Sequence, residues 1–325
     1  MNVRRRLIPT AALASATVLG LTALTACSTT SAADDKDGKL DVVASFYPMQ
    51  YLAEQIGGGH VSVTSLTEPG QEPHDLDVSV QQRGQLEESD VALYLKGLQP
   101  AVDDAIDESG IKTKVDAASL TSMEKHGNEV GGHAEEHEEE GHEGHDHGHS
   151  HEGADPHIWL DPVKYAEVAE GVGKALEKAD PDNAATYEKN TAKLVKKLGG
   201  LDKSFKNGLK DTDSKVFITT HAAFGYLAER YGLTEEAISG LDPEAEPSGK
   251  RVKDLQKMAK ADGVTTVFYE TLVSDKTAQT LAKDTGLKTD VLDPIEGITD
   301  DSKGTDYIQV MQSNLKALQK ALGAK

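Results

Sequence analysis

The stretch KVFITTHAAFGYLAERYG, residues 215–232, contains the unit from which the rest of the chain is built. Its first part is a short apolar run with β-branched residues, which predicts a buried strand. The following residues, 222–232, have the spacing of an amphipathic helix. A strand followed directly by a helix is the repeating unit of parallel α/β sheets. His221 stands at the end of this expected strand. Because ligands of open α/β sheets bind beyond the carboxyl ends of strands, this histidine marks a candidate binding position.

The same alternation extends over both halves of the chain. Strands are expected at 40–46, 61–67, 91–97, 112–118, 215–221, 234–240, 264–270 and 287–292. Helices are expected at 47–57, 79–89, 100–110, 222–232, 248–263, 274–286 and 307–323. Such alternation predicts parallel sheets with helices on both faces.

Between the two halves the pattern is helical. Asp161 and Pro162 provide a cap and a first-turn proline for one helix. A second, long helix is expected from Pro181 to about Leu209, with leucines on one side and lysines on the other. Gly199 and Gly200 weaken this helix. We therefore expect an α/β protein of two lobes, each a mainly parallel sheet flanked by helices, joined by one rigid helix, with a metal cleft between the lobes. The expected boundaries are 39–180, 181–211 and 212–325.

The N-terminus reads as an export signal. MNVRRR is followed by an apolar stretch at 7–23 that is too short for a good membrane span. Residues 24–27, LTAC, resemble a lipoprotein cleavage box, so Cys27 is the expected lipidation site after removal of residues 1–26. Residues 27–38 are polar and small, as in a tether. An ordinary signal peptide with an incidental cysteine is the alternative, and the route of export, general or twin-arginine, stays open.

Composition narrows the class of protein. Cys27 is the only cysteine, so the exported body needs a hydrophobic core rather than disulfides. The net charge of −21 argues against a nucleic-acid partner. Acidity attracts cations over a distance, although a merely solubilising surface explains most of the charge equally well.

Residues 126–151 hold eight histidines, eight carboxylates and six glycines, and such a run cannot form a core. Imidazole and carboxylate bind borderline divalent cations, zinc first. Because ordering this glycine-rich run would cost chain entropy, we expect it to bind metal weakly and at several places. These accessory histidines are His126, His133, His137, His142, His145, His147, His149 and His151.

Four histidines lie outside this run. His60 stands at a strand start, away from the expected cleft, and is interpreted as a non-ligand. His74, His157 and His221 each stand in a loop after a strand or before a helix. Near the C-terminus a strand ends in Asp293, with Glu296 close behind. Three imidazoles and one carboxylate would suit tetrahedral zinc. Taken singly, each histidine is also compatible with a surface or capping role.

Four segments decide between these interpretations: EPHDLDVS (72–79), DPHIWLDP (155–162), ITTHAAFGYLAERYGL (218–233) and LDPIEG (292–297). They resemble segments of the solute-binding lipoproteins of bacterial zinc and manganese ABC transporters. The resemblance covers nearly all of the chain from Leu40 onward. It implies that the histidines of the first three motifs, His74, His157 and His221, bind the metal. The implied fourth ligand is Glu296, with Asp293 or water as alternatives.

The resemblance also implies a function. It indicates a lipid-anchored protein at the outer face of the cytoplasmic membrane that captures Zn²⁺ and delivers it to an ABC permease. His221 favours zinc over manganese, because manganese carriers of this family tend to have a carboxylate there. A manganese or broad divalent-metal carrier, and a surface zinc store or sensor dominated by the His-rich run, are the alternatives. We expect a monomer and no enzymatic activity, since four protein ligands leave no open metal position.

Three further expectations concern the surroundings of these ligands. Glu72 or Asp75 is a candidate to orient the ring of His74. Trp159 is interpreted as packing between the lobes. Metal binding should weaken as the pH falls through roughly 6.5, because protonated imidazole cannot coordinate.

Overall fold

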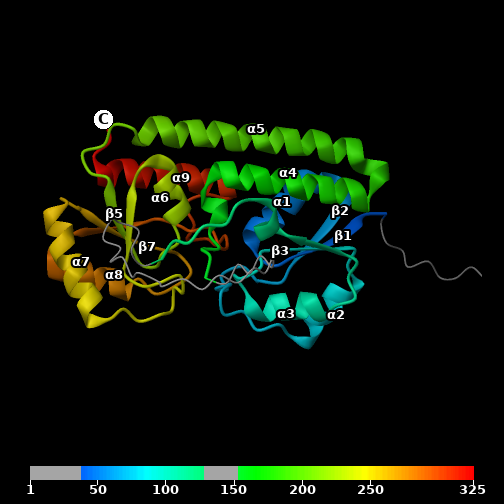
Figure 1. Cartoon of the computed structure of the whole chain (residues 1–325), viewed down its shortest axis with the longest axis horizontal. Helices are drawn as coiled ribbons and strands as arrows, with labels where there is room; N and C mark the ends of the chain where they lie inside the picture. Colours follow the sequence, from blue (N-terminus) through cyan, green and yellow to red (C-terminus); the bar gives the residue numbers. More distant parts are fainter. Residues whose placement is uncertain (1–37, 128–152) are drawn as a thin grey trace, which may run out of the picture. The chain divides into compact units, whose positions relative to one another are not determined.

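The structure, a computed structural model, describes residues 38–127 and 153–325. Gly38–Lys325 forms one compact unit, which contains two separate four-stranded sheets. In both sheets all strands are parallel, and the order is that of a doubly wound fold: the first strand of each half is flanked by the second and the third. Figure 1 shows the two sheets and the helices around them.

The first sheet has the order β2-β1-β3-β4. Two helices, α2 and α3, cover one face, where Leu86, Val102 and Ile106 pack against Val43 and Ala92. The elements of this half are β1 (Leu40–Ala44), α1 (Tyr47–Gly57), β2 (Val61–Ser65), α2 (Val80–Glu88), β3 (Val91–Tyr94), α3 (Pro100–Glu108) and β4 (Thr113–Asp116).

The second sheet has the order β6-β5-β7-β8. Two helices, α7 and α8, cover one of its faces through Leu255, Ala278 and Leu281. The elements of this half are β5 (Val216–Thr219), α6 (Gly225–Tyr231), β6 (Thr234–Ala237), α7 (Gly249–Ala261), β7 (Thr266–Tyr269), α8 (Lys276–Thr285), β8 (Lys288–Val291) and α9 (Tyr307–Leu322).

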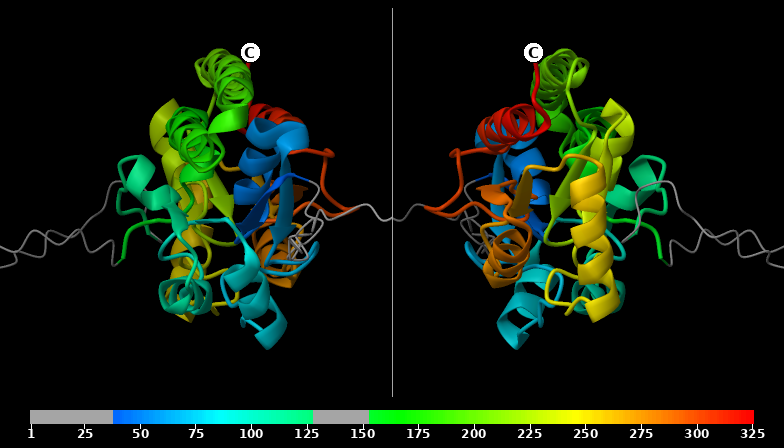
Figure 2. Two further views of the ribbon diagram at one scale, coloured as in Figure 1. Left: turned by 90° about the vertical axis from the view of Figure 1, so that its right-hand side faces the viewer. Right: turned by 90° about the vertical axis from the view of Figure 1, so that its left-hand side faces the viewer.

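Two long helices connect the halves. The first, α4 (Pro162–Ala179), begins at Asp161, whose side chain accepts a hydrogen bond from the backbone N–H of Val163. The second, α5 (Ala184–Leu209), runs without interruption through both glycines and follows a short 3₁₀ turn, Pro181–Asn183. Figure 2 shows α5 lying over α4 and α9, and Figure 1 shows that this one helix extends along both lobes.

The two lobes share a core. The largest cluster of buried apolar residues takes Val42 and Leu93 from the first sheet and Phe217 and Phe268 from the second. Trp159 belongs to the same cluster and is fully buried. The predicted fold class, two parallel-sheet lobes joined by a long helix, is confirmed. The predicted domain boundaries stay predictions, because Gly38–Lys325 does not divide further.

The expected strands are longer than the observed ones. The strand expected at 215–221 ends at Thr219, because the chain turns so that Ala222 donates to the carbonyl of Gly240. The helix expected from residue 222 accordingly begins at Gly225. Over residues 38–127 and 153–325, none of the helices is both long and apolar enough to cross a membrane. The predicted signal peptide, Cys27 and all accessory histidines except His126 lie outside the described residues.

Candidate metal centre

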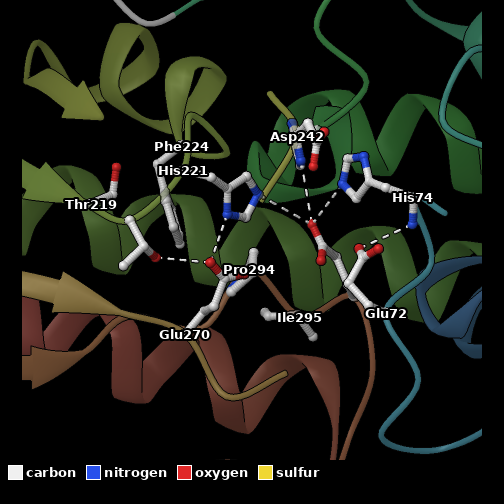
Figure 3. A network of polar contacts seen from close by, with 12 residues as sticks. Glu72, His74, Thr219, His221, Phe224, Asp242, Glu270, Pro294 and Ile295 are labelled. Atoms are coloured by element: carbon white, nitrogen blue, oxygen red, sulfur yellow. Dashed lines mark hydrogen bonds and ion pairs between the residues drawn. The ribbon is translucent and has the colours of Figure 1, made fainter. Parts of the chain in front are cut away.

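The structure brings together His74, His157, His221 and Glu296. One donor atom of each residue lies within 4.8 Å of those of the other three. His74 comes from the loop after β2 and His157 from the loop before α4, whereas His221 and Glu296 follow β5 and β8. The centre therefore lies where loops of both sheets meet. Figure 3 shows the rings of His74 and His221 approaching the same carboxylate.

All three imidazoles direct Nε2 toward one oxygen. The Oε1 atom of Glu296 lies 3.3 Å from Nε2 of His74, 3.3 Å from Nε2 of His157 and 3.5 Å from Nε2 of His221. The side chain of His74 is 11% exposed, while those of the other three are at most 2% exposed. His74 is therefore the solvent edge of a buried centre.

Two carboxylates fix the rings from behind. Asp155 Oδ1 lies 2.7 Å from Nδ1 of His157 and also accepts its backbone N–H. Glu270 Oε1 lies 2.8 Å from Nδ1 of His221 and accepts the hydroxyl of Thr220. A carboxylate at Nδ1 assigns the hydrogen to that nitrogen and leaves the Nε2 lone pair for a metal.

Several buried polar atoms of the centre lack a hydrogen-bond partner in the part of the chain that the structure describes. They are Nε2 of His157, Nε2 of His221 and Oε2 of Glu296. Buried polar atoms in folded proteins are nearly always satisfied. A divalent cation would satisfy these atoms, and three nitrogens with one carboxylate match the ligands of tetrahedral zinc.

Without a cation, the neighbouring carboxylates favour the protonated form of two of these imidazoles, His157 and His221. Burial lowers the pKa of His157, but the Asp155 and Glu296 carboxylates outweigh burial and raise that pKa to about 9. The pKa of His221 is likewise raised well above its ordinary value, because Glu270 and Glu296 outweigh burial. Burial raises the pKa of Glu296, but its three histidine neighbours hold it well below the usual range. A cation that binds at these nitrogens would therefore have to displace protons from His157 and His221.

The turn before Glu296 decides which carboxylate reaches the imidazoles. Asp293 Oδ1 accepts the backbone N–H of Ile295 at 2.7 Å, and Thr271 donates to Oδ2 of the same side chain. Ile295 has a φ of 61°, the left-handed region that branched residues rarely adopt. Asp293 thus bonds the turn and lies outside the cluster, whereas Glu296 lies within it.

The surroundings differ from expectation at His74. Glu72 accepts the backbone N–H groups of His74 and Asp75, so it holds the loop rather than the ring. Trp159 lies between the lobes, as interpreted: its Nε1 donates to the carbonyl of Pro294 at 2.6 Å. His60 lies outside the cluster, and its ring packs edge-on against the ring of Tyr187.

Asp155 and Glu270 are the residues that sequence reasoning missed. Asp155 was visible as the acidic residue two positions before His157 in a quoted motif. Glu270 follows β7, the strand next to β5, so its position at the same sheet edge as His221 was the available signal.

The fold and the site together define a class: a two-lobed α/β binding protein that offers three imidazoles and a carboxylate to a divalent cation. Comparison with known proteins narrows the class. Residues 42–321 match the family described as zinc-uptake complex component A, periplasmic, and the chain belongs to this family.

Individual relatives agree with this assignment. The chain is 37% identical to the zinc-binding lipoprotein AdcA of Streptococcus pneumoniae over 91% of its own length, yet spans only 58% of that protein. It is also 37% identical to the high-affinity zinc uptake system protein ZnuA of Bacillus subtilis, with 92% of each chain covered. The crystal structure of the Zn(II)-bound ZnuA-like domain of pneumococcal AdcA is 33% identical, with a TM-score of 0.70 over 88% of this chain and 99% of that domain.

Proposed function

We propose that this protein is an extracytoplasmic lipoprotein that captures Zn²⁺ and delivers it to an ABC-type permease for uptake. The convergence of three Nε2 atoms on Glu296 is the observation that supports the proposal most strongly. The names of its relatives agree with zinc as cargo.

In this proposal His74, His157, His221 and Glu296 are the zinc ligands. Nitrogen-rich sets favour zinc over the harder manganese, which argues against a manganese carrier. Four protein ligands would leave no open position for a metal-activated water, so a transport role is favoured over hydrolysis. The permease partner, the lipid anchor at Cys27 and the monomeric state belong to the same proposal.

The zinc-ligand assignment is tested by His221→Ala, with His60→Ala as the matched loss of a histidine outside the cluster. Competition against a chelator of known affinity measures the dissociation constant. We expect His221→Ala to weaken tight zinc binding by more than about 100-fold. Loss of a residue that only hydrogen-bonds to a metal ligand already costs roughly 10–100-fold in metal affinity. His60→Ala should bind as the parent does. Unchanged binding by His221→Ala would overturn the assignment.

The His-rich run is proposed as an accessory that raises the local zinc concentration near the centre. Removal of residues 126–151 should leave one tight site and slow zinc uptake when the metal is limiting. In a surface store dominated by the run, the same deletion would remove nearly all binding. The number of zinc ions bound by the intact protein and by the deletion variant, measured by equilibrium dialysis, distinguishes these functions.

A further inference from the structure

A second group of side chains that could hold a metal ion lies near the first. Glu124, His126 and Glu229 each offer one donor atom, and these atoms lie within 4.8 Å of one another. Glu124 and His126 belong to the segment that leads into the His-rich run, and Glu229 lies on α6. Unlike the buried centre, this cluster is open to solvent, since the side chain of Glu229 is 59% exposed.

One carboxylate serves both clusters. Asp155 is fully buried, and its Oδ1 faces Nδ1 of His157 while its Oδ2 lies 2.9 Å from Nδ1 of His126. Nε2 of His126 points away from Asp155 and lies 3.1 Å from Oε2 of Glu229. A carboxylate at one ring nitrogen with the other nitrogen directed at an acidic group is the arrangement of a metal-binding histidine. His126 and His157 have it in common.

The position of His126 is fixed by α6. The hydroxyl of Tyr226 accepts the backbone N–H of Glu124 and donates to the carbonyl of Asp155, which ties the two segments together. The rings of Tyr226 and His126 pack edge to face, with centroids 4.5 Å apart. At Gly225 an added Cβ would lie 2.6 Å from the His126 ring, so only glycine allows this approach.

We propose that Glu124, His126 and Glu229 form a second, weaker divalent-cation site at the start of the His-rich run. Zinc is the cation used below to test this site. One nitrogen and two carboxylates suit zinc, although fewer donors and greater exposure make this outer site weaker than the inner one. The proposal goes beyond the zinc-carrier function, because it assigns a fixed binding position outside the transported ion's centre.

A neighbouring lysine limits the affinity of the outer site. Lys164 Nζ lies 2.8 Å from Oε1 of Glu124 and donates to the carbonyl and hydroxyl of Ser122. Its positive charge competes with a cation for Glu124 and leaves the second carboxylate oxygen as the available donor. The outer site would thus hold zinc transiently, which suits an ion in passage.

The test uses the full-length chain with the seven histidines from His133 to His151 replaced by Asn, so that His126 is the one imidazole left in the His-rich run. Zinc titration calorimetry of this chain should show one tight and one weaker ion. His126→Ala, and separately Glu229→Gln, should weaken the second ion at least tenfold and leave the first. The matched controls His60→Ala and Glu188→Gln, the latter an exposed residue of α5, should keep both.

Anomalous diffraction at the zinc edge locates the ions. The expected result is a second peak within bonding distance of Nε2 of His126. A single bound ion, or a second ion unaffected by His126→Ala and Glu229→Gln, would overturn the outer site. The effect of His221→Ala on the tight ion is measured independently. If no ion binds at the outer site, the zinc-carrier proposal is therefore unaffected.

Discussion

Glu270 Oε1 lies 2.8 Å from Nδ1 of His221, but Glu270 is not one of the four residues proposed as zinc ligands. We expect Glu270→Gln to lower zinc affinity roughly 10–100-fold, because a neutral amide at Nδ1 would no longer raise the basicity of Nε2 of His221. Thr220→Val removes the other hydrogen bond to the same oxygen without a change of charge and should cost less. Chelator competition measures both variants. Equal affinities for Glu270→Gln and the parent would show that ring orientation depends on packing alone.

Single residues were predictable to different degrees. His74, His157 and His221 were visible because each stands in a motif, in a loop at or near the end of an expected element. Glu270 was not, because it is one of 55 acidic residues and no local pattern separates a buried carboxylate from a solvated one. Only the parallel pairing of β5 with β7 brings it beside His221.

At the scale of elements, helix starts were predicted better than strand ends. Ser79 closes a reciprocal capping box with Gln82, and Asp161 caps α4, so side chains in the sequence fix where these helices begin. Strand ends depend instead on where the partner strand stops. Thr220 continues the β-branched run of the sequence and was therefore included in the expected strand. In the structure β5 ends at Thr219, and the hydroxyl of Thr220 donates to Glu270 instead.

The exposed glycines of α5 give a prediction for this helix. Gly199 and Gly200 are solvent-exposed, and an added Cβ at either meets nothing within 4 Å. Alanine at each position should therefore stabilise the protein by about 1 kcal/mol through helix propensity. The melting temperature in thermal denaturation checks this.

Gly173 on α4 is the contrasting position for the same substitution. Its added Cβ would lie 2.3 Å from the buried hydroxyl of Thr191 on α5. Gly173→Ala should destabilise the protein by roughly 1–3 kcal/mol through overpacking. A stabilised Gly173→Ala, or a destabilised Gly199→Ala, would show that the α4–α5 contact differs from the one described.

At the scale of the whole molecule, pH should affect the metal-free and zinc-loaded forms differently. The pKa of His157 is about 9 in the folded metal-free chain and 6.5 ordinarily. Its protonation therefore stabilises the metal-free fold fully below pH 6.5, and this contribution is lost as the pH rises to about 9. Glu235, whose pKa burial raises to about 7, acts in the same direction between 4.5 and 7.

The zinc-loaded form has no such loss, because its imidazoles carry the ion instead of a proton. The increase in melting temperature caused by zinc should thus grow between pH 6.5 and 9, measured against the chain in chelator. As the pH falls, the affinity for zinc should decrease about tenfold per pH unit for each proton that zinc displaces. This decline begins near pH 9, not near 6.5 as the ordinary pKa of histidine suggested. A zinc-induced shift that stays constant with pH would contradict proton displacement.

The core that both sheets share has a consequence for unfolding. Val42 and Phe217 belong to one continuous apolar cluster, so neither half can lose its structure without exposing surface of the other. Residues 38–325 should accordingly melt as a single cooperative transition rather than lobe by lobe. A ligand that binds only the folded form raises the free energy of unfolding of everything that unfolds with it. One ion held by four side chains would then protect the entire body, from β1 to α9, against proteolysis.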